Sequence, residues 1–220
     1  MCWNENISLN TFLFGTATLI FIYYNNTYTQ YKTPEFKNYI FYFLIFSYMS
    51  MQLVEFFLWK SINTKNKNMN KMFSIIGWII LRIVQPFMAL LMIPRKYYKL
   101  QYLLFICYVL ALIILHIYKY LYNPVEFITT VDKNGHLYWK WVNLYNYEKI
   151  LFIIYLIIFL TLYLSYPYIL LFSGCVLLYS YFIYTNTFSS MWCWILNSIQ
   201  IYFLFNILFI MPYNEYQKIC

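Results

Sequence analysis

Charged residues are scarce in this sequence, in which Asp, Glu, Lys and Arg together make up 10% of 220 residues. A soluble domain usually carries about a quarter charged residues, so this chain has too few to cover a water-facing surface. Glycine is also rare, and none of the four glycines belongs to a Gly-rich phosphate-binding loop. Hydrophobic residues make up 63% of the chain. The composition therefore predicts an integral membrane protein, because such a chain is stable only where lipid surrounds much of its surface.

Metal ligands and catalytic acids are rare as well. The chain has two histidines, His116 and His136, and no aspartate inside an apolar segment. No pair of its five cysteines has the spacing of a metal site, and membrane zinc hydrolases need several His or carboxylate ligands. We therefore expect neither a metal nor another cofactor. The last apolar segment has no central lysine for a retinal Schiff base, and the third ends without the acidic-Arg-aromatic triplet of rhodopsin-like receptors.

Basic residues outnumber acidic ones by 15 to seven, which gives a net charge of +8. Such an excess is compatible with nucleic-acid binding, but the basic residues lie between apolar segments. There they anchor helix ends and contact anionic lipid headgroups. Many of the tyrosines lie at the ends of apolar segments, as in the aromatic belts of membrane proteins. We therefore expect the lipid bilayer, including anionic headgroups, as the partner, and no nucleic acid; the sequence defines no oligomeric state.

Seven apolar segments approach the roughly 20 residues that a helix needs to cross the hydrocarbon core. They cover residues 8–24, 38–59, 72–93, 100–121, 149–165, 168–185 and 191–211. The fifth and sixth are separated only around Pro167, and one straight helix over both would measure about 50 Å, against a core of about 30 Å. Because proline disfavours helical geometry in the residue before it, we predict two spans joined by a tight turn. One kinked span is the alternative, and it would move the C-terminus to the other side.

The predicted fold class is thus an all-α, polytopic transmembrane bundle of about seven helices, with residues 1–220 forming a single domain. One connection, between the fourth and fifth helices, differs from the others. Residues 125–131 and 136–142 are rich in β-forming residues, and the Asn134-Gly135 pair between them is a strong hairpin signal.

Pairing of the two segments across a two-residue turn would place one set of side chains on the same face, namely Ile128, Leu137, Trp139 and Trp141. We expect this face of the 125–142 hairpin to rest on helix ends or on the headgroup layer, with Trp139 and Trp141 forming a lid. The alternative is a disordered loop.

Seven spans would place the N-terminus, the 60–71 connection and the hairpin on one side of the membrane, called side A. The 25–37 and 94–99 connections and the C-terminus would lie on side B. Basic residues are divided almost evenly, so the positive-inside rule gives no clear answer from the totals. The first span has Glu5 before it and lysines after it, which favours an external or lumenal N-terminus. The four lysines of the 60–71 connection point the other way.

Polar side chains inside apolar segments are costly and are therefore functional candidates. In the second segment Gln52 and Glu55 share one helical face. An arginine at position 82 of the antiparallel third segment has the length to reach Glu55, and pairing lowers the cost of burying both charges. Pro86 removes the amide that would otherwise bond to the Arg82 carbonyl. The candidates at similar depth near side A are Gln52, Glu55, Arg82, Gln85, His116, Asn197 and Gln200.

We interpret these residues as the lining of one polar cavity that opens toward side A, with Glu55 and Arg82 at its charged centre. In the alternative interpretation, they only fix the helix register or hydrogen-bond neighbouring helices. The leading hypothesis is a non-enzymatic protein that binds or transports a small polar or lipid-headgroup ligand. The alternatives are a membrane-embedded lipid-modifying enzyme that uses Glu55 or His116 as an acid–base group, and a membrane scaffold without a ligand.

Three short segments carry a resemblance: Gln52-Leu-Val-Glu55-Phe-Phe-Leu-Trp59, Gln85-Pro86 and Gly135-His-Leu-Tyr-Trp-Lys-Trp141. Together they resemble segments of uncharacterised seven-span proteins of large DNA viruses and some protists. The resemblance implies no known activity and no catalytic residues.

Overall fold

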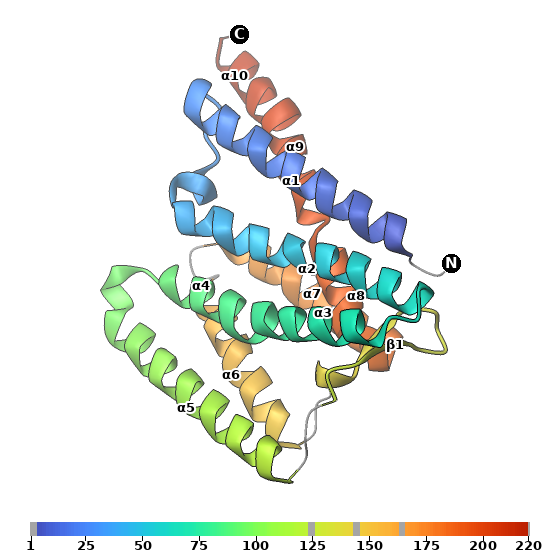
Figure 1. Ribbon diagram of the computed structural model, residues 1–220. Helices are drawn as coiled ribbons and strands as arrows, with labels where there is room; N and C mark the ends of the chain where they lie inside the picture. The colour runs from blue at the N-terminus through green and yellow to red at the C-terminus, as the bar shows by residue number, and fades with distance from the viewer. Residues whose placement is uncertain (1–3, 123–125, 143–145, 163–165, 220) are drawn as a thin grey trace.

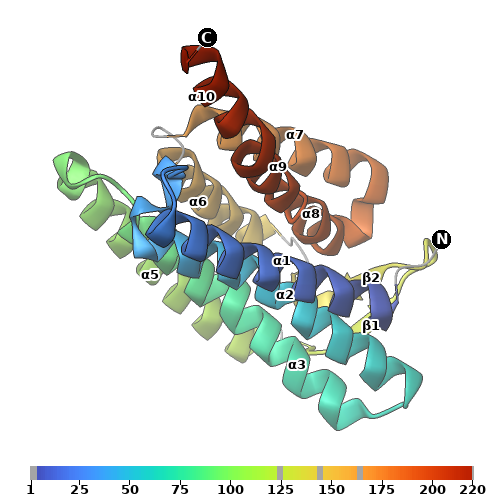
Figure 2. The same cartoon turned by 90° about the horizontal axis from the view of Figure 1, so that it is seen from above.

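The computed structural model of the chain describes residues 4–122, 126–142, 146–162 and 166–219, and these residues are mostly helical. The long helices lie side by side in an elongated bundle, and a small two-stranded sheet covers one end of it (Figure 1). Seen from above, α1 lies over α2, and the C-terminal helices lie beside α1 and next to α7, while α5 lies on the outside of the bundle (Figure 2).

The described residues of the seven predicted apolar segments are mostly helical, but the third and the seventh segments are each divided into several helices. The helices in chain order are α1 (Glu5–Tyr28), α2 (Tyr39–Asn63), α3 (Lys67–Ile79), α4 (Gln85–Leu91), α5 (Tyr98–Tyr122), α6 (Asn146–Leu162), α7 (Pro167–Tyr184), α8 (Phe188–Leu196), α9 (Ile199–Phe205) and α10 (Met211–Ile219). A π-helical turn, Ile80–Val84, joins α3 to α4, and a second, Asn206–Ile210, joins α9 to α10. Short 3₁₀ turns, Pro34–Lys37, Arg95–Tyr97, Lys140–Val142 and Thr185–Thr187, lie in the connections.

Five of the described segments are long and apolar enough to cross a membrane: Glu5–Tyr28, Tyr39–Asn63, Lys67–Leu91, Arg95–Ile117 and Pro167–Gln217. The helix α6 has 17 residues, and the last segment folds back on itself, because α8 packs against α7. The chain therefore has the build of a multi-pass membrane protein. The number of seven spans stays a prediction.

The break between the fifth and sixth predicted spans falls where proline requires it. The helix α6 ends at Leu162, and α7 begins at Pro167. Proline is tolerated in the first turn of a helix because the amide that it lacks would have no partner within the helix. Residues 163–165, which include part of the predicted turn, lie outside the described residues. Two separate helices thus replace the single kinked span.

Large apolar side chains cover the outside of the bundle. Examples are Ile114 on α5 and both Leu171 and Phe182 on α7, which are all well exposed. An exposed apolar surface of this extent is costly in water but is the expected surface of a helix against lipid. This distribution agrees with the membrane protein that the composition predicts.

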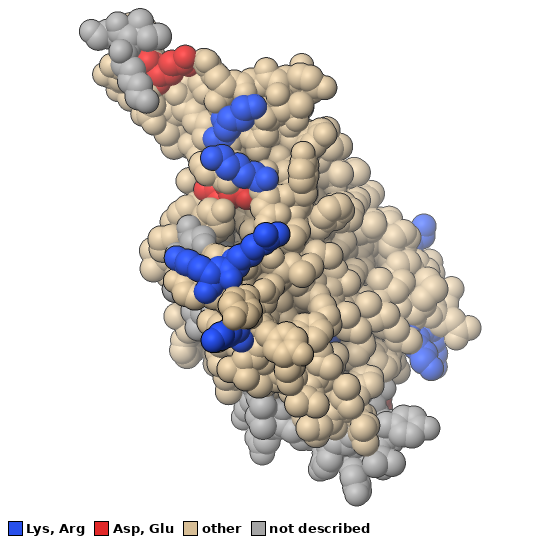
Figure 3. All heavy atoms as spheres, turned by 90° about the vertical axis from the view of Figure 1, so that its left-hand side faces the viewer, with Lys and Arg blue, Asp and Glu red and all other residues tan. Residues whose placement is uncertain are grey.

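The connections that the sequence analysis assigned to side A and to side B lie at opposite ends of the bundle. At one end, the Asn63 amide on α2 donates to the Glu5 carboxylate at 3.3 Å. At the other end, the Gln30 amide after α1 donates to the Glu215 carboxylate of α10 at 2.6 Å. Figure 3 shows this second end, with basic side chains in a band across it. The α1–α2 and α4–α5 connections contain the five basic residues that we assign to this basic band, namely Lys32, Lys37, Arg95, Lys96 and Lys99.

The predicted hairpin is present, with β1 (Thr129–Val131) antiparallel to β2 (Leu137–Trp139), but its register differs from the prediction by one residue. Val131 pairs with Leu137, because the turn contains an additional residue, and Gly135 adopts a left-handed conformation with φ 78°. A shift of one residue moves side chains to the opposite face. Consequently Thr129 rather than Ile128 lies on the buried face, and Ile128 is exposed. Residue 125 of the predicted hairpin lies outside the described residues.

The hairpin is fastened to the α2–α3 end of the bundle by hydrogen bonds. The Asn70 side chain accepts from the Thr129 amide at 2.9 Å and donates to the Thr129 carbonyl at 3.0 Å, as a neighbouring strand would. The Thr129 hydroxyl contacts Ser74 at 2.9 Å and accepts from the Trp141 indole at 3.2 Å. Trp141 is completely buried beside Gly77, the residue on α3 whose missing side chain leaves room for the indole.

Candidate functional site

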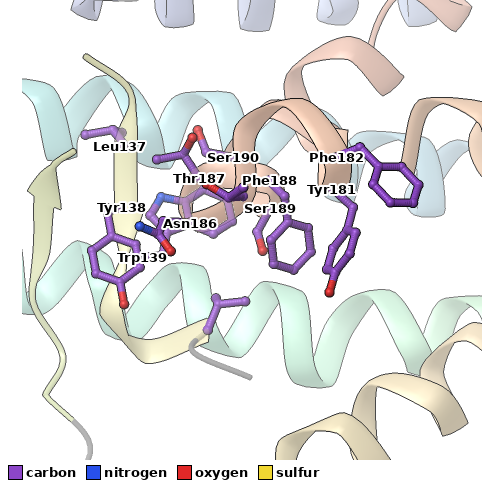
Figure 4. Close-up of a pocket in the computed structure, with 12 residues that line it drawn as sticks. Leu137, Tyr138, Trp139, Tyr181, Phe182, Asn186, Thr187, Phe188, Ser189 and Ser190 are labelled. Atoms are coloured by element: carbon purple, nitrogen blue, oxygen red, sulfur yellow. The ribbon is translucent and has the colours of Figure 1, made fainter. Parts of the chain in front are cut away.

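A cavity of about 390 Å³, called the vestibule, lies between the hairpin and the α7–α8 connection. Figure 4 shows strand β2 with Tyr138 and Trp139 on one side of it, and Tyr181 and Phe182 of α7 on the opposite side. Its polar lining comes from one short run of the chain, Thr185, Asn186, Thr187, Ser189 and Ser190. The vestibule therefore combines aromatic walls with a group of hydroxyls and an amide.

The hairpin also contacts the α7–α8 connection directly. The Asn134 side chain in its turn donates to the Thr187 hydroxyl at 2.8 Å, and the His136 ring packs edge-on against Tyr184 with centroids 5.2 Å apart. Thr185 has φ 34°, a left-handed conformation that is unfavourable for a β-branched residue. Strained backbone of this kind is held in place by its surroundings and is concentrated at functional sites.

Glu55 lies immediately behind the wall of the vestibule. Its side chain is buried, and its Oε1 accepts a hydrogen bond of 2.6 Å from the Ser190 hydroxyl, which itself lines the vestibule. Gln52 lies one turn earlier on α2 and is also buried, with its amide near the same carboxyl group but outside hydrogen-bond geometry. Ser190 thus links a cavity that is open to the surroundings with a carboxyl group inside the bundle.

Arg82 is buried as well, but it forms no ion pair with Glu55. In the parts of the chain that the structure describes, the ion pair that is formed joins Lys140 to Glu126 on the hairpin at 3.2 Å. The predicted pairing fails because residues 80–84 form a π-helical turn, with the Gln85 amide bonded to the Ile80 carbonyl. A π-turn changes the rotation of the helix, so α-helical spacing no longer indicates which way position 82 points.

The carbonyl of Arg82 behaves as the sequence predicts. Pro86 has no amide to donate to it, and the Tyr108 hydroxyl of α5 donates to it instead at 2.8 Å. Gln85 has a comparable structural role, because its amide donates to the Ser47 carbonyl and accepts from the Tyr155 hydroxyl, both at 3.3 Å. These bonds join α2, α4, α5 and α6, as the interhelical alternative for the polar residues expects.

Three of the predicted site residues lie away from the vestibule. Asn197 donates to the Cys193 carbonyl of its own helix at 2.8 Å, and Gln200 donates to the Met49 sulfur at 3.4 Å. Both line a separate void of about 10 Å³. His116 is exposed on α5 and packs on Trp78, with ring centroids 4.8 Å apart. The structure therefore divides the one predicted cavity into separate regions.

The two predicted lid residues have different positions. Trp139 lines the vestibule and stacks on Trp141 with ring centroids 5.0 Å apart. Its indole N–H is buried and has no acceptor among the described residues. Trp141 does not line the vestibule and instead anchors the hairpin to α3. Trp139 is thus a wall of the vestibule, and Trp141 holds that wall in place.

Another small cavity, of about 20 Å³, lies beside Arg82. Its lining consists of Leu81, Arg82, Val142, Phe152, Tyr155, Ser189, Trp192 and Cys193. Val142 and Ser189 also line the vestibule, so this cavity lies directly behind the vestibule wall.

Three residues of these two cavities were not predicted as site residues, namely Ser189, Ser190 and Trp192. The available signal was the run 185–190, in which five of six residues are polar although it adjoins apolar segments.

Docking of the hairpin is expected to weaken at acidic pH. Burial lowers the pKa of His136 below its ordinary value of about 6.5, although nearby Asp132 acts in the opposite direction. The docked hairpin therefore favours the neutral imidazole, and docking loses stability as the pH falls below about 6.5. Hydrogen exchange of residues 129–139, corrected for intrinsic rates, should be faster at pH 5.5 than at pH 7.5. The same pH dependence in His136→Gln would contradict this explanation.

Comparison of the chain with protein-family models, with curated proteins and with solved structures gives no match. The resemblance of three short segments to viral and protist seven-span proteins stays a prediction. The function is therefore inferred from the geometry of the vestibule and of the buried polar groups.

Proposed function

We propose that the chain is a multi-pass membrane protein that binds a small amphipathic molecule in the vestibule, with a lipid headgroup or a similar polar group as the part bound. The observation that supports this most directly is the hydrogen bond from Ser190, on the vestibule wall, to the buried carboxyl of Glu55. A carboxyl group behind a wall of hydroxyls favours a ligand that donates hydrogen bonds, such as an amine or a hydroxyl group.

The dimensions and walls of the vestibule agree with such a ligand. Its volume of about 390 Å³ lies within the range of small-molecule pockets. Tyr181, Phe182 and Phe188 provide apolar surface for hydrocarbon, and the described lining contains no charged side chain. The exposed apolar faces of α7 next to the vestibule would rest against lipid, which supplies ligands of this chemistry.

The basic band supports a proposed contact with anionic lipid headgroups and a proposed orientation in the membrane. Its five Lys and Arg residues lie at the end of the bundle opposite the hairpin, where they would contact anionic headgroups on side B. With an external or lumenal N-terminus, this end faces the cytosol, as the positive-inside rule favours.

Native mass spectrometry of the purified protein with defined lipids tests the ligand. We expect retention of phosphatidylethanolamine, whose headgroup amine donates hydrogen bonds, over phosphatidylcholine, whose quaternary ammonium group has no donor. Glu55→Gln should lower the apparent affinity for phosphatidylethanolamine about tenfold, because an amide in place of the carboxyl group changes the acceptor that holds the Ser190 hydroxyl on the vestibule wall. Ser190→Ala should act in the same direction, because it removes the wall group bonded to Glu55.

Ser198→Ala is the matched control, since Ser198 is exposed and its hydroxyl bonds to the Ile195 carbonyl of the preceding turn. It should bind lipid like the wild type. If Glu55→Gln and Ser190→Ala also bind like the wild type, the vestibule is not the binding site. Retention without any headgroup preference would favour the scaffold alternative.

One observation favours the lipid-modifying enzyme as a second candidate. A serine hydroxyl that donates to a carboxyl at 2.6 Å is an arrangement that can activate the hydroxyl as a nucleophile. The other acid–base candidate, His116, is on the outside of α5. Conversion of a bound lipid by the wild type, together with binding but no conversion by Ser190→Ala, would establish the enzyme.

A further inference from the structure

The lining of the cavity of about 20 Å³ beside Arg82 includes two residues whose hydrogen-bond donors lack acceptors among the described residues. The Arg82 side chain is 4% exposed, and its terminal Nη2 has no hydrogen-bond partner among the described residues. Trp192 lines the same cavity, is 5% exposed, and has an indole N–H without an acceptor in that part of the chain. Two residues from different elements, each with a buried donor that lacks an acceptor among the described residues, therefore line one small space.

The charge of Arg82 makes this arrangement costly unless an anion is present. Arginine keeps its proton in proteins, so the guanidinium carries a full positive charge inside the bundle. A buried charge without a partner is strongly destabilising. No acidic residue is among the described residues that line the cavity, and the Glu55 carboxyl accepts from Ser190 rather than from Arg82. In the part of the chain that the structure describes, the cavity thus has a cationic side chain and a second donor residue but no anionic side chain.

The cavity size selects the kind of anion. A space of about 20 Å³ accommodates a single water molecule or an ion of similar size, and excludes phosphate and carboxylate groups. From the lone guanidinium, the unpaired indole N–H and this volume, we infer that Arg82 and Trp192 bind one chloride ion. The site is independent of the vestibule ligand, although Ser189 and Val142 line both spaces.

Thermal unfolding of the purified protein tests the site. Chloride is exchanged for gluconate, which is too large for the cavity, at constant ionic strength. An ion that binds only the folded state raises the melting temperature with its concentration. We expect a rise of roughly 3–6 °C for each tenfold increase in chloride above its Kd. Bromide should substitute for chloride, and its anomalous scattering in a crystal should place it between Arg82 and Trp192.

Variants separate an ion site from a merely structural arginine. Arg82→Met should remove the chloride dependence, whereas Arg82→Lys, which keeps the charge, should retain part of it. Trp192→Phe should raise the apparent Kd for chloride about tenfold, because one donor to a charged group is lost. Arg95→Met is the matched control, since Arg95 is exposed at the other end of the bundle. It should leave the dependence unchanged.

Two results would overturn the inference. The first is an identical melting temperature of the wild type in chloride, bromide and gluconate. The second is a bromide peak absent from the cavity in crystals grown in bromide, which would indicate that water occupies it. Both measurements use the wild type, so they remain decisive even if Arg82→Met does not fold.

Discussion

Replacement of Gly77 by leucine is expected to displace Trp141 and detach the hairpin from α3. Even a Cβ atom at this position would lie 3.2 Å from two ring carbons of Trp141 and 3.2 Å from the Val54 side chain. None of these atoms is at the end of a flexible side chain, and a leucine adds three more carbons. Loss of the buried indole from its site costs about 3–5 kcal/mol, as when a core tryptophan is truncated.

Hydrogen exchange of residues 129–139 and tryptophan fluorescence would detect this change as faster exchange and a red shift of the emission. Gly174→Leu is the matched control, because a Cβ atom at Gly174 on α7 meets nothing within 4 Å. It should leave the hairpin docked. If the two leucine variants show the same exchange as the wild type, Trp141 does not depend on the space at Gly77.

Asn70→Asp is expected to have an effect of similar size by a different mechanism. The substitution preserves the shape of the side chain, but it removes the donor to the Thr129 carbonyl and to the Ser61 hydroxyl. It also brings a negatively charged oxygen against that carbonyl inside the protein. Loss of these bonds, with a buried carbonyl left unsatisfied, costs about 2–5 kcal/mol. The hairpin should lose most of its hydrogen-exchange protection, while α2 keeps its own.

The control for this variant is Asn68→Asp, two residues earlier in the first turn of α3. Asn68 is exposed, and a negative charge near a helix N-terminus is tolerated or favourable. Unchanged lipid binding by Asn70→Asp would show that the vestibule does not need the docked hairpin, contrary to its position as one wall.

The helices were predictable because the signals that define them are local. An apolar segment long enough to cross a bilayer is visible in a single stretch of sequence, although several helices extend beyond the predicted bounds, as α3 does from residue 72 back to Lys67. Asn4, Asn38 and Asn66 each precede a helix, and each side chain accepts from an amide of the first turn. The interruption at Pro167 is equally local, because it follows from the geometry of proline alone.

The candidate site was predicted only in part, because it depends on the rotation and pairing of distant segments. The depth of Glu55 and Arg82 follows from counting residues, but the π-turn at Ile80–Val84 changes the direction of Arg82 and is not apparent from α-helical spacing. His116 was also placed correctly along its helix but not around it. Its side chain is exposed on the outside of α5 instead of facing a cavity.

Ser190 was missed for a related reason. Its significance comes from a hydrogen bond to Glu55, a residue 135 positions earlier in the chain. A serine next to an apolar helix is common, and nothing local distinguishes this one. The hairpin was found from Asn134-Gly135, but its register was wrong because the turn uses Gly135 as a bulge residue instead of closing in two residues.

The two attachments of the hairpin also impose an order on biogenesis. During synthesis, Thr129 can meet Asn70 as soon as the hairpin leaves the ribosome, since α3 is already made. Asn134 must wait for Thr187, which is translated 53 residues later. The vestibule is therefore completed only when the last helices have entered the membrane. A nascent or truncated chain that stops before residue 187 would have a hairpin held at one edge alone, so that ligand retention would report complete insertion.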